Sequence, residues 1–293
     1  MDLGETFTAS QAYVMLSRVE DINQLVIMDR IKVKSIRINP DALKELEKMN
    51  ARSINNNPTI WSREEGTSTK IAVLNVMNLR NNFRYAAQDS TLLLADLICF
   101  SETCMTTEAD ERTCTIEGYD AYFNSAGNGK GIVGFCKRGV FQHEADQRLG
   151  LAQLTLFTSR DINVIHVYRS QHQPIDELLR AIETLRRKDR TTVVCGDLNL
   201  CLRKQPTNQF TLRMQDWGLS QIVKDATHIQ GGHIDHVYVS SEVVGKVNIE
   251  RTSPFYSDHD TLCVTIVEQV PQPETFITII YLSSYRKKRL PRL

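Results

Sequence analysis

Residues 192–199 read TVVCGDLN, an apolar run that ends in a glycine, a carboxylate and an amide. The apolar part predicts a buried strand. Asp197 and Asn199 flank Leu198, so on an extended segment both side chains point to the same side. There they can hold a water molecule and a phosphoryl oxygen together. The alternative is a β-turn in which Gly196, Asp197 and Asn199 only satisfy turn geometry.

Polar residues of the same kind lie within or just after other apolar runs. Asn75 stands inside one such run, where a buried amide needs hydrogen-bond partners or a ligand. Glu102 follows another run, and residues 234–236 and 257–259 read IDH and SDH. Each residue has an ordinary alternative role on its own, such as a loop cap or a strand-edge charge. As a set, they suit phosphodiester hydrolysis with a divalent cation, because such a site needs oxygen ligands, a base for water and a group that stabilises the phosphate charge.

Composition indicates an ordinary globular protein. Of the 293 residues, 41% are hydrophobic and 24% charged, and Lys+Arg equals Asp+Glu at 35 each. A nucleic-acid partner would therefore be held by local basic patches and not by net charge. The seven cysteines contain no C-x-x-C pair, which argues against a disulfide framework or a zinc knuckle and favours a reducing compartment. There is no apolar run of about 18 residues, so we expect an intracellular protein with no membrane span.

The chain divides into four segments. Residues 1–50 contain an apolar strand and a helix that begins at Pro40, with Asn39 as its N-cap. Residues 51–69 are a linker by composition. Residues 70–268 form the main domain, and 269–293 form a basic tail, which could be a targeting signal, a DNA contact or a solvated end.

The main domain contains ten strand-like runs and one clear amphipathic helix, residues 175–187. Few helices separate the runs, which favours an α/β sandwich of two packed sheets flanked by helices. The runs are residues 71–76, 97–101, 121–124, 132–137, 152–158, 162–168, 192–195, 233–239, 247–252 and 262–267.

In order and spacing, the polar set resembles the endonuclease/exonuclease/phosphatase superfamily, which includes DNase I and the apurinic endonucleases. The resemblance implies a DNase I-like, four-layer sandwich of two mixed β-sheets flanked by helices. The matching segments are LNV at 74–76, DLICFSET at 96–103, VYR at 167–169, GDLN at 196–199, IDH at 234–236 and SDH at 257–259. Two departures stand out: Ser101 replaces a common Gln, and Arg169-Ser170-Gln171 replaces a common Pro-Asn.

The resemblance also implies metal and water roles. Glu102 and Asn75 would hold Mg²⁺, for which Mn²⁺ could substitute, with help from Asp258. Asp197 would orient or deprotonate the attacking water, and Asn199 would hold Asp197 in place.

The remaining implied roles concern the phosphate. Asp235 would fix the tautomer of His259, whose other nitrogen faces the phosphate. Tyr168 would contact the phosphate or the leaving oxygen, and Arg169 and Ser170 would bind substrate. Cleavage would leave 3′-hydroxyl and 5′-phosphate ends.

The amino-terminal segment shows a second resemblance. Residues 11–19, QAYVMLSRV, are similar to the last conserved motif of superfamily 1 DNA helicases, in which Arg18 would match the nucleotide-binding arginine. No GxxxxGK[ST] loop occurs in the chain, so we expect a vestigial helicase end without ATPase activity. The alternative is an unrelated helical hairpin. A helicase end joined to an endonuclease resembles the C-terminal part of a Helitron-type transposon protein.

These resemblances predict an Mg²⁺-dependent DNA endonuclease of transposon origin, nuclear in location and acting on single- or double-stranded DNA. A full-length helicase or replication protein would be its partner. One alternative is a catalytically silent DNA-binding remnant. Another is a phosphodiesterase of the same superfamily with a substrate that is not a nucleic acid.

Overall fold

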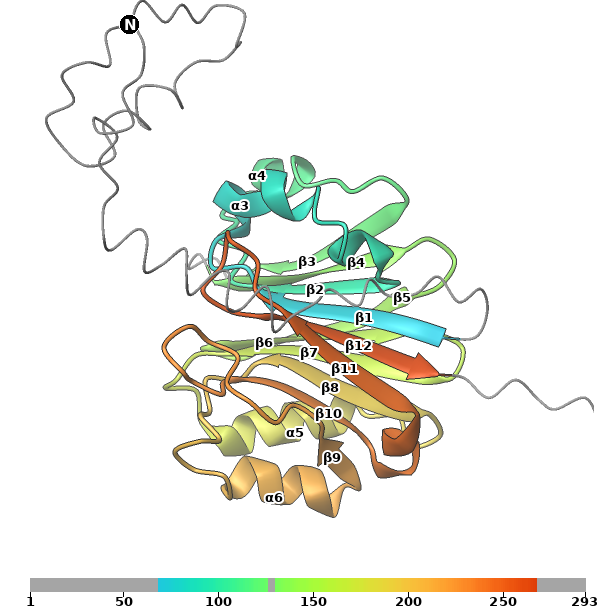
Figure 1. Cartoon of the computed structure of the whole chain (residues 1–293), viewed down its shortest axis with the longest axis vertical. Helices are drawn as coiled ribbons and strands as arrows, with labels where there is room; N and C mark the ends of the chain where they lie inside the picture. The colour runs from blue at the N-terminus through green and yellow to red at the C-terminus, as the bar shows by residue number, and fades with distance from the viewer. Residues whose placement is uncertain (1–67, 126–129, 268–293) are drawn as a thin grey trace, which may run out of the picture.

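The computed structural model describes residues 68–125 and 130–267, which form two six-stranded sheets packed face to face (Figure 1). The first sheet has the order β11-β12-β1-β2-β4-β3. Its β1–β2 pair is parallel and its other pairs are antiparallel. Its strands are β1 (Ser68–Asn75), β2 (Leu97–Ser101), β3 (Tyr119–Ser125), β4 (Gly131–Lys137), β11 (Val247–Thr252) and β12 (Thr261–Val267).

The second sheet has the order β5-β6-β7-β8-β10-β9, and again one pair, β7–β8, is parallel. Both sheets are therefore mixed, as the resemblance to DNase I-like proteins implies. The strands of the second sheet are β5 (Gln142–Arg148), β6 (Ala152–Thr158), β7 (Ile162–Arg169), β8 (Thr191–Asp197), β9 (Leu219–Gln221) and β10 (Asp235–Ser240).

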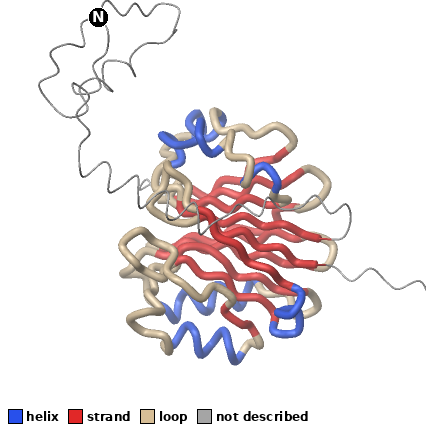
Figure 2. The backbone as a smooth tube through the Cα atoms, in the orientation of Figure 1, coloured by secondary structure: helices blue, strands red, loops and turns tan. Residues whose placement is uncertain are grey.

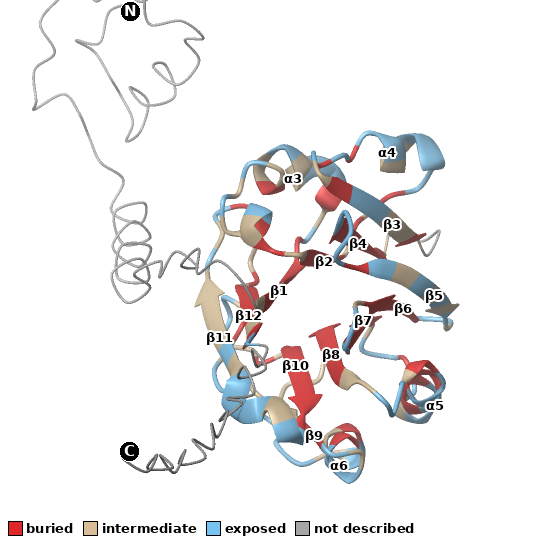
Figure 3. Ribbon diagram, turned by 90° about the vertical axis from the view of Figure 1, so that its right-hand side faces the viewer, coloured by how far each residue is buried: buried red, intermediate tan, exposed pale blue. Residues whose placement is uncertain are grey.

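Helical segments cover the outer faces of the two sheets and complete the four predicted layers (Figures 1 and 2). The central strands are buried (Figure 3). One apolar cluster fills the space between the sheets, with Val73, Phe157 and Val193 among its members, and two others lie on the outer faces. The helical segments are α3 (Leu79–Ala86), η3 (Leu92–Leu94), α4 (Glu108–Arg112), α5 (Ile175–Leu185), α6 (Gln209–Asp216) and η4 (Ser241–Lys246).

The structure confirms the predicted sandwich and contains two strands that the apolar pattern missed. The predicted helix is α5, which ends at Leu185, two residues earlier than expected. Strand β5 reads QHEADQR and lies at a sheet edge, where polar side chains discourage pairing with another chain. Strand β9 has only three residues. Neither strand carries enough apolar residues to be recognised by periodicity.

Several predictions lie outside the described residues: the helicase-like segment at 1–50 with Arg18, most of the linker at 51–69, and the basic tail at 269–293. They stay predictions.

No helix in residues 68–125 or 130–267 is both long and apolar enough to cross a membrane.

Candidate active site

The polar side chains expected to act together lie at strand ends that meet where the two sheets adjoin. Asn75 is the last residue of β1, Asp197 the last of β8 and Asp235 the first of β10. The side-chain amide of Asn75 donates from Nδ2 to Oδ2 of Asp197 at 2.8 Å, which links the two sheets. Asp235 pairs with Asp197 across the β8–β10 ladder. Residues 122 positions apart in sequence therefore share one site.

Gly196 is required by the close approach of β7 to β8. Its φ is +133°, and a Cβ at this position would lie 1.9 Å from the carbonyl oxygen of Val167. Any side chain would push the strands apart or change the backbone path. The glycine therefore fixes where the next residue, Asp197, presents its carboxylate.

Asp197 is buried, with 2% of its surface exposed, and is surrounded by donors. Its Oδ1 accepts the backbone N–H of Asn199 at 2.9 Å, and the Asn199 side chain donates to the carbonyl of Arg169 at 2.9 Å. Burial raises the pKa of Asp197 to about 7, and the charge of Asp235 adds to the rise. The charge of His259 and the hydrogen bonds from Asn199 and Asn75 act in the opposite direction. A carboxylate in this environment can exchange a proton near neutral pH.

Asp235 and His259 form a buried pair. The Nδ1–H of His259 donates to Oδ2 of Asp235 at 2.8 Å, and the hydroxyl of Thr227 donates to the same oxygen at 2.6 Å. Burial lowers the pKa of His259, but the hydrogen bond and charge of Asp235, with the charges of Asp197 and Asp258, outweigh it and raise the pKa to about 9. Because Nδ1 is engaged, Nε2 is the nitrogen that remains for a ligand.

Ser257 fixes the segment that carries His259. Its hydroxyl donates to the carbonyl of Asn75 at 2.6 Å and accepts the backbone N–H of His259 at 3.0 Å. The SDH segment is thus attached to the end of β1.

Glu102 follows β2 and binds two groups from different parts of the chain. The hydroxyl of Tyr168, on β7, donates to its Oε1 at 3.0 Å, and Nζ of Lys130 lies 2.7 Å from its Oε2. Burial and the nearby charge of Glu102 raise the pKa of Tyr168 well above its usual value, so the phenol stays protonated and acts as a donor.

Backbone strain in the described residues is concentrated at this site. Four non-glycine residues have positive φ: Met77 (62°), Glu102 (56°), Cys104 (54°) and Asn199 (50°). All four follow the ends of β1, β2 or β8 by one to three residues. Such conformations cost about 1–3 kcal/mol each and persist where the surroundings impose them, often at functional sites.

Asp258 forms a second group with His228 and His259, with ligand atoms within 4.8 Å of one another. The backbone N–H of Gln230 donates to Nδ1 of His228 at 3.1 Å, so the proton of the neutral ring is on Nε2. Nε2 lies 3.3 Å from Oδ2 of Asp258, so His228 and Asp258 are close enough to interact when the ring carries a charge.

The residues expected from the sequence to hold a cation carry the oxygen donors that Mg²⁺ prefers, namely carboxylates on Glu102 and Asp258 and an amide on Asn75. The amide oxygen of Asn75 also accepts the backbone N–H of Met77 at 2.9 Å. The Oδ1 atom of Asp258 is buried and has no hydrogen-bond partner within the described part of the chain, as expected for an oxygen reserved for a ligand. Oε2 of Glu102 already accommodates a positive charge, the ammonium of Lys130.

The two residues expected to bind substrate, Arg169 and Ser170, directly follow Tyr168 in the chain. Arg169 is buried, and its guanidinium donates to the carbonyls of Gln173, Leu198 and Gln171 at 2.9–3.1 Å. These contacts favour a structural role, because the donors that would face a phosphate are used by the backbone. Ser170 donates its backbone N–H to Leu151. Its role in substrate binding stays a prediction.

Two residues of the site have no part in the sequence-based set: Lys130, which pairs with Glu102, and Thr227, which orients Asp235. Thr227 lies a few residues before the IDH segment at 234–236. Its closeness in sequence to that segment is the only sequence feature that points to it. Lys130 lies in a glycine-rich stretch without periodicity.

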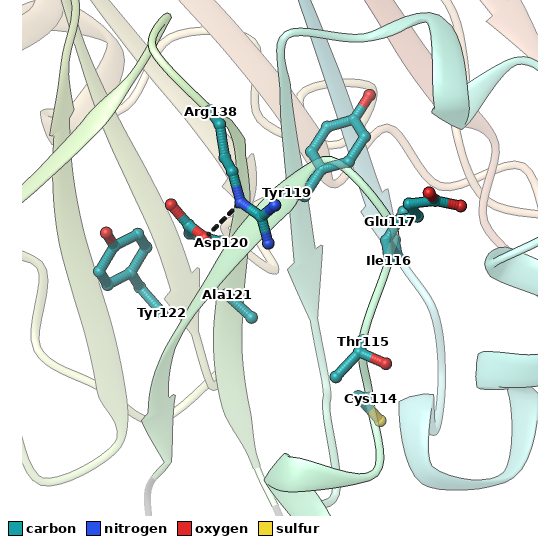
Figure 4. Close-up of a pocket in the computed structure, with 9 residues that line it drawn as sticks. All are labelled: Cys114, Thr115, Ile116, Glu117, Tyr119, Asp120, Ala121, Tyr122 and Arg138. Carbon is teal, nitrogen blue, oxygen red and sulfur yellow. Dashed lines mark hydrogen bonds and ion pairs between the residues drawn. The ribbon is translucent and has the colours of Figure 1, made fainter.

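A separate pocket of about 560 Å³ lies at the other end of the first sheet (Figure 4). One of its lining residues is Tyr119, which pairs with Lys137, the last residue of β4. The active site lies at the opposite end of β4, where Ile132 pairs with Ser101. Arg138 and Asp120 form an ion pair on its wall at 3.0 Å. None of its lining residues belongs to the site described above.

A buried carboxylate, a histidine–aspartate pair and oxygen donors are groups that metal-assisted hydrolysis of phosphate esters uses. Comparison with family profiles agrees. Residues 64–259 match the Endonuclease/Exonuclease/phosphatase family, and the chain belongs to this family. Its members are generally hydrolases that act on phosphodiester bonds. Comparison with curated protein sequences gives no match.

Solved structures share the fold at low sequence identity. The endonuclease domain of TRAS1, a telomere-specific non-LTR retrotransposon, has a TM-score of 0.53 and 14% identity, covering 69% of this chain and 100% of that one. An AP endonuclease from Archaeoglobus fulgidus has a TM-score of 0.52 and 17% identity with the same coverage. The AP endonuclease LMAP from Leishmania major has a TM-score of 0.53 and 14% identity, covering 79% and 99%.

Proposed function

We propose that the chain is a Mg²⁺-dependent endonuclease that hydrolyses DNA and leaves 3′-hydroxyl and 5′-phosphate ends. The observation that carries the proposal is the meeting of Asp197 with the buried Asp235–His259 pair, with one ligand atom of each within 4.8 Å of the others. All three residues are at most 6% exposed. Three ionisable groups are costly to bury together, and an arrangement of this kind favours catalysis over a structural role.

The pKa values support complementary roles for two of these groups. With Asp197 at about 7 and His259 at about 9, a carboxylate and an imidazolium coexist between these pH values. The carboxylate of Asp197 accepts a proton from water as the water oxygen bonds to phosphorus. The imidazolium of His259 donates from Nε2 to a phosphate oxygen, whose negative charge grows during the attack. The bond from phosphorus to the 3′ oxygen breaks, and that oxygen takes up a proton from solvent.

Glu102, Asn75 and Asp258 are the residues that would hold the cation. When bound, it supplies positive charge that stabilises the phosphate during attack. Tyr168 donates to Glu102 and keeps that carboxylate in one orientation.

DNA is the proposed substrate on two grounds. The similar solved structures include a retrotransposon endonuclease domain and AP endonucleases. The segment at residues 11–19 resembles a DNA helicase motif, which also suggests a transposon origin and a nuclear location.

The test uses the purified full chain with three substrates: supercoiled plasmid, a duplex with one abasic site, and inositol polyphosphates. Each is incubated with Mg²⁺ and with EDTA. The variant Asp197→Ala is compared with the control Asp189→Asn. Asp189 is an exposed acid just before β8, at the end of that strand opposite to Asp197. The proposal expects Mg²⁺-dependent DNA nicking that disappears only in Asp197→Ala. DNA binding without nicking would indicate a silent remnant, and release of phosphate from the small esters alone would indicate a different substrate class.

A further inference from the structure

Glu102, the proposed metal ligand, is already paired with a cation that belongs to the protein. Nζ of Lys130 lies 2.7 Å from its Oε2, and the Tyr168 hydroxyl occupies its Oε1 at 3.0 Å. The Glu102 side chain is 16% exposed and that of Lys130 is 44% exposed. The ion pair is therefore partly screened by solvent.

The backbone holds the two residues next to each other. Lys130 precedes Gly131, the first residue of β4, and the carbonyl of Gly131 accepts the N–H of Thr103 at 3.1 Å. A Cβ at Gly131 would lie 2.8 Å from Oγ1 of Thr103, so the two segments are tightly packed. Glu102 is fixed further by its positive φ of 56°. The pair is thus a consequence of the packing of β4 against the end of β2.

A divalent cation on Glu102 would stand beside the ammonium of Lys130, and like charges at this distance repel. We propose that Lys130 competes with the divalent cation for Glu102 and, when displaced, pairs with a substrate phosphate, so that metal and substrate strengthen each other's binding. The inference rests on the proposed role of Glu102 as a metal ligand. The lysine stem is flexible and carries a point charge, which suits an exchange between two anionic partners.

This exchange gives a reciprocal coupling. A phosphate that draws Lys130 away leaves Glu102 to the cation, and a cation that displaces Lys130 leaves the ammonium to the phosphate. By linkage, each ligand must raise the affinity of the other by the same factor. In the absence of substrate, the ion pair keeps the affinity for metal low.

The first experiment measures Mn²⁺ binding to the full chain by the EPR signal of free Mn²⁺, without DNA. We expect Lys130→Met to lower the Kd for Mn²⁺ roughly 3- to 10-fold and Lys130→Arg to leave it near the wild-type value. The matched control is Lys137→Met, which removes a lysine that is the last residue of β4, is 49% exposed and is ion-paired with Asp96. Glu102→Gln should weaken binding in either background.

The second experiment measures the coupling in an Asp197→Asn background, which prevents cleavage. Adding a 20-base-pair DNA duplex should lower the Kd for Mn²⁺, and this effect should shrink when Lys130→Met is also present.

The outcomes are distinguishable. If wild type binds Mn²⁺ through Glu102 but Lys130→Met binds it no more tightly, the competition is refuted and the metal site stands. If Lys130→Met binds more tightly but the duplex effect is unchanged, the exchange with phosphate is refuted. If Glu102→Gln binds Mn²⁺ as wild type does, the metal role of Glu102 is itself refuted.

Discussion

Replacing Asp235 by asparagine should lower the pKa of His259 and move the alkaline limit of activity to lower pH. Asp235 accepts the Nδ1–H of His259 at 2.8 Å in a buried site. Burial lowers the pKa of His259, and Asp235 is the largest of the influences that raise it to about 9. An amide oxygen can still accept from His259 and Thr227, so the change mainly removes a charge.

The size of the effect follows from the difference between charged and neutral hydrogen bonds. A hydrogen bond to a charged group contributes about 1.5–3 kcal/mol, against about 0.5–1.5 kcal/mol for a neutral one. The two ranges differ by about 1–1.5 kcal/mol, so at about 1.36 kcal/mol per pH unit loss of the charge should lower the pKa of His259 by about 1 pH unit. A histidine is protonated below its pKa, so the imidazolium would be lost at correspondingly lower pH.

Two measurements check this expectation. The Cε1–H shift of His259, followed by NMR in the metal-free protein, gives the pKa directly, and kcat/KM for plasmid nicking between pH 6 and 10 gives the alkaline limit. The control is Asp225→Asn, which removes an exposed carboxylate that contacts Arg251. An unchanged His259 titration in Asp235→Asn would refute the reasoning.

Three further predictions concern other parts of the site. Asp197→Asn should abolish nicking yet stabilise the protein at pH 8 in EDTA by about 1–3 kcal/mol. The reason is that the carboxyl pKa is raised from 3.8 to about 7, so ionising this buried group costs stability progressively as pH rises from about 4 to about 7. Thermal melts at pH 4 and pH 8 check this, and an equal effect at both would contradict it. Gly196→Ala should cost more than about 3 kcal/mol, or prevent folding, because its Cβ would meet the Val167 carbonyl at 1.9 Å; urea unfolding measures the loss, and near-native stability would contradict it. Tyr168→Phe should keep the fold, seen as an unchanged Tm within a few degrees, but slow nicking at least about tenfold because Glu102 loses a hydrogen bond; wild-type nicking would contradict this role.

The sequence predicted the sheets wherever strands are apolar on both faces. Strands β6 and β7 are buried along their whole length and stand out as apolar runs. Strand β5 alternates between exposed and half-buried residues at an edge, and its polar sequence resembles a loop. The edge strands β3 and β11 of the first sheet were predicted, so periodicity misses the edge strands that are polar throughout, such as β5, or very short, such as β9.

For the site, the sequence indicated the residues but not their partners. Asn75 and Asp197 each looked unusual at a strand end, yet their hydrogen bond depends on how two sheets pack. Arg169 shows the same limit, because the hydrogen bonds of its guanidinium to three backbone carbonyls depend on the folded loop and cannot be read from the sequence. Lys130 carried no signal, since only the packing of β4 against β2 brings it to Glu102.

In the proposed mechanism, Asp197 and His259 act together in metal-assisted hydrolysis of DNA. The most direct measurement is single-turnover nicking of supercoiled plasmid by the full chain with Mg²⁺, followed by treatment with DNA ligase. Wild type should produce nicked circles that ligase reseals, which requires 3′-hydroxyl and 5′-phosphate ends, and Asp197→Asn and His259→Asn should each be inactive. Nicking that survives in both variants, or nicks that ligase cannot seal, would contradict the account.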